Sequence, residues 1–199
     1  RDKYSIKHIE HDQEIIKDIK EVEFSLEQIE KGNYKYFMLK EIFEQPNSIK
    51  DSIRGRIQED NTVKLGGIYE RTQDILNAKD IYITACGTSW HAAQIGSYIL
   101  ESVLSKPIKV EYASEFRYRN KHLDSDSLVI SISQSGETAD TLSAIRKAKE
   151  HGSLTLGIVN VVGSSIARET DCGIYMHAGP EIGVASTKAF TSQVVILSL

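Results

Sequence analysis

The stretch SISQSGET, at residues 131–138, indicates the fold of this chain. A continuous apolar run, residues 128–130, leads into it, and a helical pattern begins directly after it. Such a run is typical of a strand that is buried on both faces of a parallel sheet. Where such a strand turns through a glycine, here Gly136, into a helix, the first N–H groups of the helix are free and carry a partial positive charge. The stretch therefore predicts a site for an anion such as phosphate.

Strands and helices alternate on both sides of this stretch. Near-continuous apolar runs predict strands at about Ile81–Ala85, Ile108–Tyr112, Leu128–Ile132, Leu154–Val159 and Gly173–His177. Helical spacing predicts helices at Ser89–Leu104, Thr138–His151, Ser164–Glu169 and from Thr187 onward. This alternation is typical of an α/β fold with a five-stranded parallel sheet and helices on both faces. Ligands of such sheets bind at the carboxyl ends of the strands, so we expect the loops that follow strands to carry the function.

Further helices are predicted before the sheet. Residues 1–34 are charged, and their apolar positions fit an amphipathic helix or a packed linker: Ile15, Ile19, Val22, Leu26 and Ile29. A second helix is predicted over Tyr36–Gln45, where Pro46 should stop it, followed by a short helix toward Ile53. Residues 55–67 are polar and bounded by glycines, which predicts a loop, and residues 68–78 have a helical pattern.

The composition excludes several classes of protein. The 199 residues suit one domain or a little more, and 40% hydrophobic with 26% charged residues is typical of a globular protein. A net charge of −4 lacks the basic character of nucleic-acid binding, and no apolar run reaches the length of a membrane span. No Cys/His spacing indicates a metal site. Cys86 and Cys172 lie in apolar runs, which predicts reduced core residues in a cytoplasmic protein.

The loop after the first predicted strand is ACGTSW, residues 85–90. Gly87 permits a tight turn, and Thr88 or Ser89 could simply cap the following helix, which is worth about 1 kcal/mol. The same arrangement after the third strand favours a ligand site instead. There Ser133, Ser135 and Thr138 together offer more hydroxyl groups than capping needs. No lysine or arginine occurs in either loop, so neutral donors would hold the anion.

The patterns of other phosphate-binding and hydrolytic sites are absent. The chain has no G-x-G-x-x-G after a strand and no G-x-x-x-x-G-K-[ST], and the turn at residue 135 does not fit G-x-S-x-G. The last loop, GPEIGVASTKAF at 179–190, offers Glu181 as a candidate acid or base and Lys188 as a candidate cation. For both, helix-end electrostatics or a surface ion pair is the alternative, and the sequence leaves it open.

Five segments, in this order and spacing, resemble the isomerase half of the glutamine–fructose-6-phosphate aminotransferase family. They are YFMLKEIFEQP (36–46), ACGTS (85–89), SQSGETADT (133–141), GSS (163–165) and EIGVASTKAF (181–190). SQSGE alone marks only a sugar-isomerase (SIS) domain, whereas the whole set, from about Leu26 to Leu199, points to this family. The resemblance implies an SIS-type three-layer α/β/α sandwich. It implies an extension from a missing glutaminase domain at residues 1–34 and a first SIS domain at 35–199, truncated before a second.

The resemblance also implies a substrate and its binding residues. Family members convert fructose 6-phosphate and glutamine-derived ammonia to glucosamine 6-phosphate in hexosamine biosynthesis, without a cofactor or metal. Carried over by motif, the phosphate is bound by Ser133, Gln134, Ser135 and Thr138. The sugar or its phosphate is contacted by Thr88, Ser89, the backbone of Val184 and the hydroxyl of Ser186.

The family's Schiff-base lysine, isomerising glutamate and ring-opening histidine belong to the second SIS domain or the C-terminal tail. The glutaminase nucleophile belongs to the N-terminal domain. We therefore expect this chain to bind sugar phosphate, to pair as a homodimer and to be inactive alone. Two alternatives remain, a non-catalytic sugar-phosphate sensor and a stand-alone phosphosugar isomerase. The sensor usually has a basic DNA-binding helix, which residues 1–79 do not show, and segments 40–46 and 181–190 argue against both.

Overall fold

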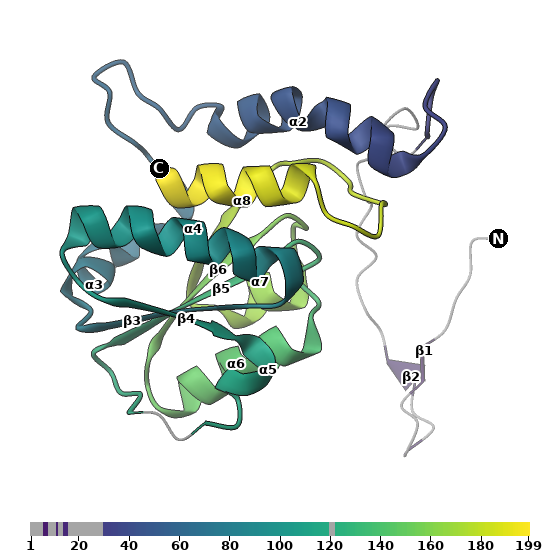
Figure 1. The fold of residues 1–199 in the computed structure, drawn as a ribbon. Helices are drawn as coiled ribbons and strands as arrows, with labels where there is room; N and C mark the ends of the chain where they lie inside the picture. The colour runs from purple at the N-terminus through teal and green to yellow at the C-terminus, as the bar shows by residue number, and fades with distance from the viewer. Residues whose placement is uncertain (1–5, 8–10, 12–13, 16–29, 120–121) are drawn as a thin grey trace.

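Five parallel strands form the central sheet, in the order β4-β3-β5-β6-β7 (Figure 1). The computed structural model describes residues 6–7, 11, 14–15, 30–119 and 122–199. The strands are β3 (Asp80–Ala85), β4 (Ile108–Tyr112), β5 (Ser127–Ser133), β6 (Leu154–Val159) and β7 (Cys172–Tyr175). Strands β5 and β6 are buried along their whole length and β3 along almost all of it, because helices cover both faces of the sheet.

The strand order brings two loops together at one edge of the sheet. The chain runs from β3 outward to β4 and then returns to β5, so that β3 lies between the other two. Strands β3 and β5 pair in parallel from Asp80 opposite Ser127 to Ala85 opposite Ile132. The direction of winding reverses between these two strands, and such a reversal opens a crevice beyond the strand ends. The loops at residues 86–89 and 134–138 both begin there.

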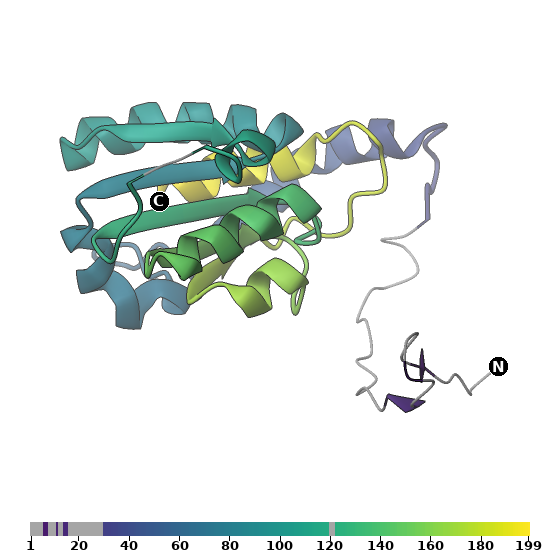
Figure 2. The same cartoon turned by 90° about the horizontal axis from the view of Figure 1, so that it is seen from below.

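Helices lie on both faces of the sheet (Figures 1 and 2). On one face, α4 (Gly87–Leu104) and α8 (Lys188–Ser198) pack on a core that includes Ile83 and Leu197. On the other face, α5 (Ala113–Phe116), α6 (Ala139–Glu150) and α7 (Ser165–Glu169) pack on cores that include Phe116 and Ile166. This arrangement confirms the predicted three-layer α/β/α sandwich.

The helices before the sheet pack around this sandwich. Helix α2 (Phe37–Ile53) lies against the outer side of α8 (Figure 1). The 3₁₀ helix η1 (Gly66–Arg71) and the short α3 (Thr72–Asn77) lead into β3. Two short strands, β1 (Ile6–Lys7) and β2 (Glu14–Ile15), pair antiparallel near the N-terminus.

The predicted strands and helices of the sheet region are confirmed, with ends that differ by at most two residues. Helix α5 was not predicted, because four residues are too few for a helical periodicity. The predicted helix over residues 68–78 is a 3₁₀ helix followed by α3, and it begins at Gly66. Ile15, assigned to a possible helix within residues 1–34, lies in strand β2. The other four apolar positions of that prediction lie outside the described residues.

The prediction that Pro46 ends a helix is wrong, because α2 continues through Pro46 to Ile53. Proline lacks the N–H that would bond to the carbonyl four residues earlier, here that of Ile42. The side-chain amide of Gln45 donates to this same carbonyl at 3.0 Å and so replaces the missing bond. Pro46 is exposed, and α2 has buried residues both before it, Lys40 and Glu41, and after it, Ser48 and Ser52. Local compensation and packing therefore outweigh the helix-breaking tendency.

Both cysteines are free and only partly buried, each packed beside a core cluster. Burial, with a smaller contribution from the Asp171 carboxylate, raises the pKa of the Cys172 thiol from 9.0 to about 11. A thiol with so high a pKa is almost entirely protonated at neutral pH and therefore a poor nucleophile. The structure thus favours a packing role for Cys172.

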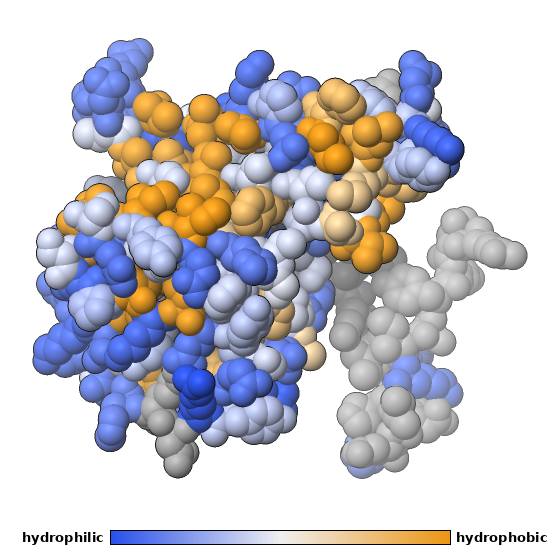
Figure 3. Space-filling view, viewed as in Figure 1, coloured by the Kyte–Doolittle hydropathy of each residue, from blue (hydrophilic) through white to orange (hydrophobic). Residues whose placement is uncertain are grey.

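Apolar side chains gather on the surface formed by α2 and α4 (Figure 3). On α2 the exposed apolar residues include Phe43, which is 63% exposed, and on α4 they include Tyr98 and Val103.

Among the described residues, no helix is long and apolar enough to cross a membrane.

Candidate functional site

The turn between β5 and α6 is held by its own hydroxyl groups. The backbone N–H of Gly136 donates to Ser133 Oγ at 3.0 Å, and Ser133 Oγ also lies 3.0 Å from Thr138 Oγ1. The N–H of Glu137 donates to Ser135 Oγ at 3.2 Å. Gly136 has a φ of +68°, which permits this tight turn without strain. The hydroxyl groups of Ser133, Ser135 and Thr138 thus fix the shape of the turn.

Neither helix that begins at the crevice is capped by a side chain. The N-cap residues of α4 and α6 are Cys86 and Thr138, and the side chain of neither makes a cap hydrogen bond. Thr138 bonds to Ser133 instead, so it does not cap α6. Simple capping therefore does not explain this hydroxyl, and within the described part of the chain the first N–H groups of both helices have no side-chain partners.

A cavity of about 220 Å³ lies at this crevice. It is lined by Cys86, Ser89, Ile132, Ser133, Gln134, Ser135, Thr138, Glu181, Gly183, Val184 and Ser186. Seven of the eight binding residues predicted from the sequence are therefore brought together from three separate loops. The eighth, Thr88, is exposed and is not among the lining residues. The side chain of Val184 is fully exposed.

The contact between Gln193 and Ser89, behind the cavity, was not predicted from the sequence. Gln193, on α8 and only 1% exposed, donates from Nε2 to Ser89 Oγ at 2.9 Å. Because this oxygen accepts from Gln193, the hydroxyl hydrogen of Ser89 is free to point toward the cavity. Ser186 Oγ is buried and has no hydrogen-bond partner among the described residues. The polar Gln193 within an apolar helix was the signal in the sequence, but only the fold places it behind Ser89.

Glu181 and Lys188 both have structural partners. Glu181 Oε1 accepts hydrogen bonds from the N–H groups of Thr187 and Ala189, at 2.8 and 3.2 Å, at the start of α8. Lys188, only 3% exposed, donates to Glu44 Oε2 on α2 at 2.6 Å. The structure favours helix-end electrostatics for Glu181. Lys188 forms an ion pair, as one alternative predicts, but its side chain is buried and not at the surface.

The β5–α6 turn is also tied to the start of α7. The N–H of Ile166 donates to the carbonyl of Gly136 at 2.9 Å, and the N–H of Ser165 donates to Glu137 Oε1 at 2.8 Å. Hydrogen bonds from Ser165 hold the pKa of the Glu137 carboxyl below its ordinary value. The carboxylate therefore stays ionised at neutral pH and is turned toward α7.

The described lining of the cavity carries no cationic side chain. No lysine or arginine is among the described residues that line it, and its only charged residue is Glu181. Attraction would come from helix N-termini and hydroxyl groups, as the sequence predicts. Within the described part of the chain, no three His, Cys, Asp or Glu residues gather in a way that could hold a metal ion.

A larger cavity, about 500 Å³, lies at the opposite edge of the sheet, beside the starts of β5 and β6. Four of the charged side chains there pair with one another, Arg71 with Asp74 at 3.2 Å and Lys149 with Asp171 at 3.1 Å. Its position at the amino ends of the strands is also not where open α/β sheets bind ligands. We therefore assign the site to the smaller cavity.

Comparison with known proteins agrees with this geometry. The SIS domain family matches residues 74–199, which include the whole central sheet and all of the residues that line the cavity. The chain belongs to the SIS domain family. Its SIS domain is similar to the C-terminal domain of glucosamine-fructose-6-phosphate aminotransferase from Francisella tularensis. The TM-score is 0.77 and the identity 44%, over 85% of this chain and 47% of that one.

The sequence of the chain is also similar to those of glutamine–fructose-6-phosphate aminotransferases. The enzyme from Chlorobaculum tepidum is 58% identical over 198 residues, which are 99% of this chain and 32% of that protein. The enzyme from Bacteroides thetaiotaomicron is 56% identical over 187 residues, 94% of this chain and 30% of that protein. The chain therefore spans about a third of the length of these curated relatives, and its resemblance to the isomerase half of the family is confirmed.

Proposed function

We propose that this SIS domain binds a phosphosugar, fructose 6-phosphate or glucosamine 6-phosphate, in the 220 Å³ cavity. The observation that carries the proposal is the convergence of two uncapped helix starts and several hydroxyl groups on one cavity. A phosphate accepts hydrogen bonds only, and these groups are donors. Neutral donors favour modest affinity, which suits a substrate that must leave after reaction.

Each residue has a part in this proposal. Gln134, Ser135 and the N-terminus of α6 donate to the phosphate, while Ser133 and Thr138 hold the turn and contribute the one hydroxyl hydrogen that their mutual bond leaves free. Ser89, oriented by Gln193, donates from the opposite loop. The sugar is contacted by Thr88, the backbone of Val184 and the unpartnered hydroxyl of Ser186.

We propose that this chain is one domain of a longer protein that carries out the reaction of its full-length relatives. The full protein would convert fructose 6-phosphate and glutamine-derived ammonia to glucosamine 6-phosphate, with residues 35–199 as its first SIS domain. Residues 1–34 would connect it to a glutaminase domain. Because Glu181 and Lys188 are occupied by structural bonds, we propose that this chain binds the sugar but does not isomerise it alone.

We further propose a cytoplasmic homodimer. The two free cysteines fit a reducing compartment, and the exposed apolar side chains of α2 and α4 (Figure 3) offer a surface for a second copy. Sedimentation equilibrium distinguishes a pair from a single chain. A monomer at micromolar concentration would contradict the dimer and leave the sugar site unaffected.

The proposed site is tested by calorimetric titration with glucosamine 6-phosphate, glucosamine and inorganic phosphate. We expect Ser135→Ala to weaken phosphosugar binding about tenfold or more, since a hydrogen bond to a charged group is worth about 1.5–3 kcal/mol. Ser143→Ala is the matched control, because Ser143 Oγ bonds to the carbonyl of Ala139 within α6. Equal weakening by both variants, or no binding by the folded chain, would contradict the site.

The proposal that this chain does not turn the sugar over alone is tested by an activity assay. Formation of glucosamine 6-phosphate from fructose 6-phosphate and ammonia would contradict it.

A further inference from the structure

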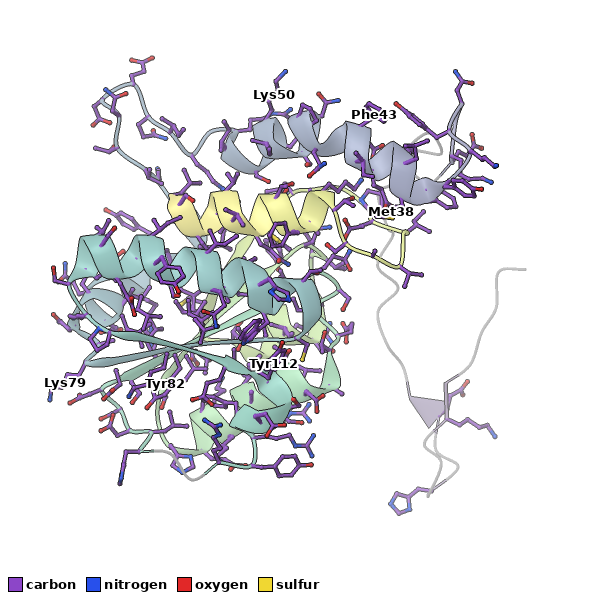
Figure 4. The ribbon with its side chains drawn as sticks, viewed as in Figure 1. Met38, Phe43, Lys50, Lys79, Tyr82 and Tyr112 are labelled. Carbon is purple, nitrogen blue, oxygen red and sulfur yellow. The ribbon has the colours of Figure 1, made fainter. Side chains whose placement is uncertain are left out.

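Helix α2 contacts the loop that closes one side of the cavity. This loop, residues 179–187, runs from the region after β7 to the start of α8 and supplies Gly183, Val184 and Ser186 to the cavity. Met38, labelled in Figure 4, marks the end of α2 that lies beside the loop. A segment about 140 residues earlier in the chain thus borders the candidate site.

Glu41 of α2 makes the closest polar contacts to this loop. Its carboxylate accepts the N–H of Ile182 at 2.5 Å and the N–H of Gly183 at 3.0 Å. Glu41 is only 2% exposed, so water does not compete strongly for these bonds. A charged acceptor with two backbone donors fixes two successive peptide groups directly before Val184.

The fit between Glu41 and the loop is close. A Cβ added at Gly183 would lie 2.5 Å from Glu41 Oε2 and 3.3 Å from the Cα of Met38. Any side chain at this position would therefore displace either the Glu41 carboxylate or the loop, and either shift disturbs this contact. One contact therefore accounts for the residue type at two positions, Gly183 in the segment 181–190 and Glu41 in the segment 40–46.

A second bond joins α2 to the end of the same loop. Glu44, one turn after Glu41, accepts from the buried Lys188 at 2.6 Å and lies 3.5 Å from Lys40. The loop is thus held by α2 at residues 182–183 and again at residue 188, on either side of Val184 and Ser186. Neither bond depends on a ligand.

We propose that Glu41 is a positioning residue for the sugar-binding loop: it holds Ile182 and Gly183 so that the backbone of Val184 and the hydroxyl of Ser186 face the cavity. Glu44 supports it through Lys188. This inference rests on the proposed function of the cavity. It assigns to α2, which precedes the matched SIS segment, a direct part in shaping the site.

The hydrogen bonds from Ile182 and Gly183 to Glu41, here called the clamp, are tested without any ligand, by amide hydrogen exchange on the 199-residue chain. We expect Glu41→Ala to speed exchange at Ile182 and Gly183 by about tenfold or more, because their acceptor is lost. Glu41→Gln keeps one oxygen acceptor and should retain most of the protection. Glu150→Ala, at the exposed end of α6, is the control for a surface glutamate. Unchanged exchange at both amides in Glu41→Ala would overturn the proposal.

The consequence for binding is tested by titration with glucosamine 6-phosphate and with inorganic phosphate. Glu41→Ala should weaken the phosphosugar about tenfold, with rescue by Glu41→Gln, and leave inorganic phosphate unchanged, since phosphate contacts the β5–α6 turn. Weakening of both ligands alike, or of neither, would overturn a positioning role. If the unaltered chain binds neither ligand while exchange still depends on Glu41, the proposed function fails and the clamp stands.

A double-mutant cycle separates the clamp from general destabilisation. Gly183→Ala clashes with Glu41, and most of that clash disappears when Glu41 is already alanine. The loss of phosphosugar affinity caused by Gly183→Ala should therefore be severalfold smaller in the Glu41→Ala background. Additive losses would overturn the proposed contact, and a thermal unfolding scan of each variant confirms that it is folded.

Discussion

Gly136→Ala is expected to destabilise the chain by about 3 kcal/mol and to abolish phosphosugar binding at millimolar concentration. Gly136 has a φ of +68°, and a side chain in this left-handed region costs about 1–2 kcal/mol. The new Cβ would also lie 2.1 Å from Ser164 Oγ and 2.5 Å from Ser164 Cβ, on a residue that is buried. Overpacking of this kind costs about 1–3 kcal/mol.

Gly152→Ala is the matched control for this prediction. Gly152 also has a positive φ, of +77°, but an added Cβ there meets nothing within 4 Å. Its cost should be the backbone term alone, about 1 kcal/mol, with binding unchanged. Denaturant unfolding and calorimetric titration of both variants give the comparison. Equal destabilisation by the two substitutions would show that the contact with Ser164 does not matter.

The second site substitution Ser164→Gly tests the same contact from its other side. It removes both atoms that the new methyl group would meet, so it should restore part of the stability lost in Gly136→Ala. Binding should return with it, because the turn regains its shape. Absence of any rescue would place the cause in the backbone conformation of Gly136.

The sheet could be predicted from the sequence because its strands are buried on both faces. Runs such as 128–132 and 154–159 are almost uninterrupted by polar residues, and the helices between them have clear periodicity. The strand order, and with it the reversal between β3 and β5, does not follow from these local patterns. Helix α2 was predicted to end too early, because the Gln45 side chain that compensates for Pro46 is not a feature of helix propensity.

The residues of the candidate site that lie in loops after strands could be predicted from the sequence. The residues on distant helices that support these loops could not. The hydroxyls of residues 133–138 stand out because helix capping needs only one of them. Gln193 and Glu41 are different, since each is an ordinary polar residue on a helix until the fold places it against Ser89 or Gly183. Such contacts join residues more than 100 positions apart, and no short-range pattern indicates them.

Gly67→Ala is expected to lower stability by about 3 kcal/mol, which for a chain of this size lowers the melting temperature by about 10 °C. The backbone of η1 packs against the edge strand β7 at this point. A Cβ at Gly67 would lie 2.0 Å from the carbonyl oxygen of Gly173, and a backbone atom cannot move aside as a flexible side chain can. Either η1 or β7 must therefore shift.

Gly66→Ala is the control for this substitution, because a Cβ at the neighbouring glycine meets nothing within 4 Å and neither glycine has a positive φ. Its melting temperature should stay within about 2 °C of the original chain, since a surface substitution without a new contact changes stability little. A shift of β7 in Gly67→Ala would also displace the loop that follows it, residues 179–187, and weaken phosphosugar binding. If Gly67→Ala melts like Gly66→Ala, the close approach of η1 to β7 is wrong.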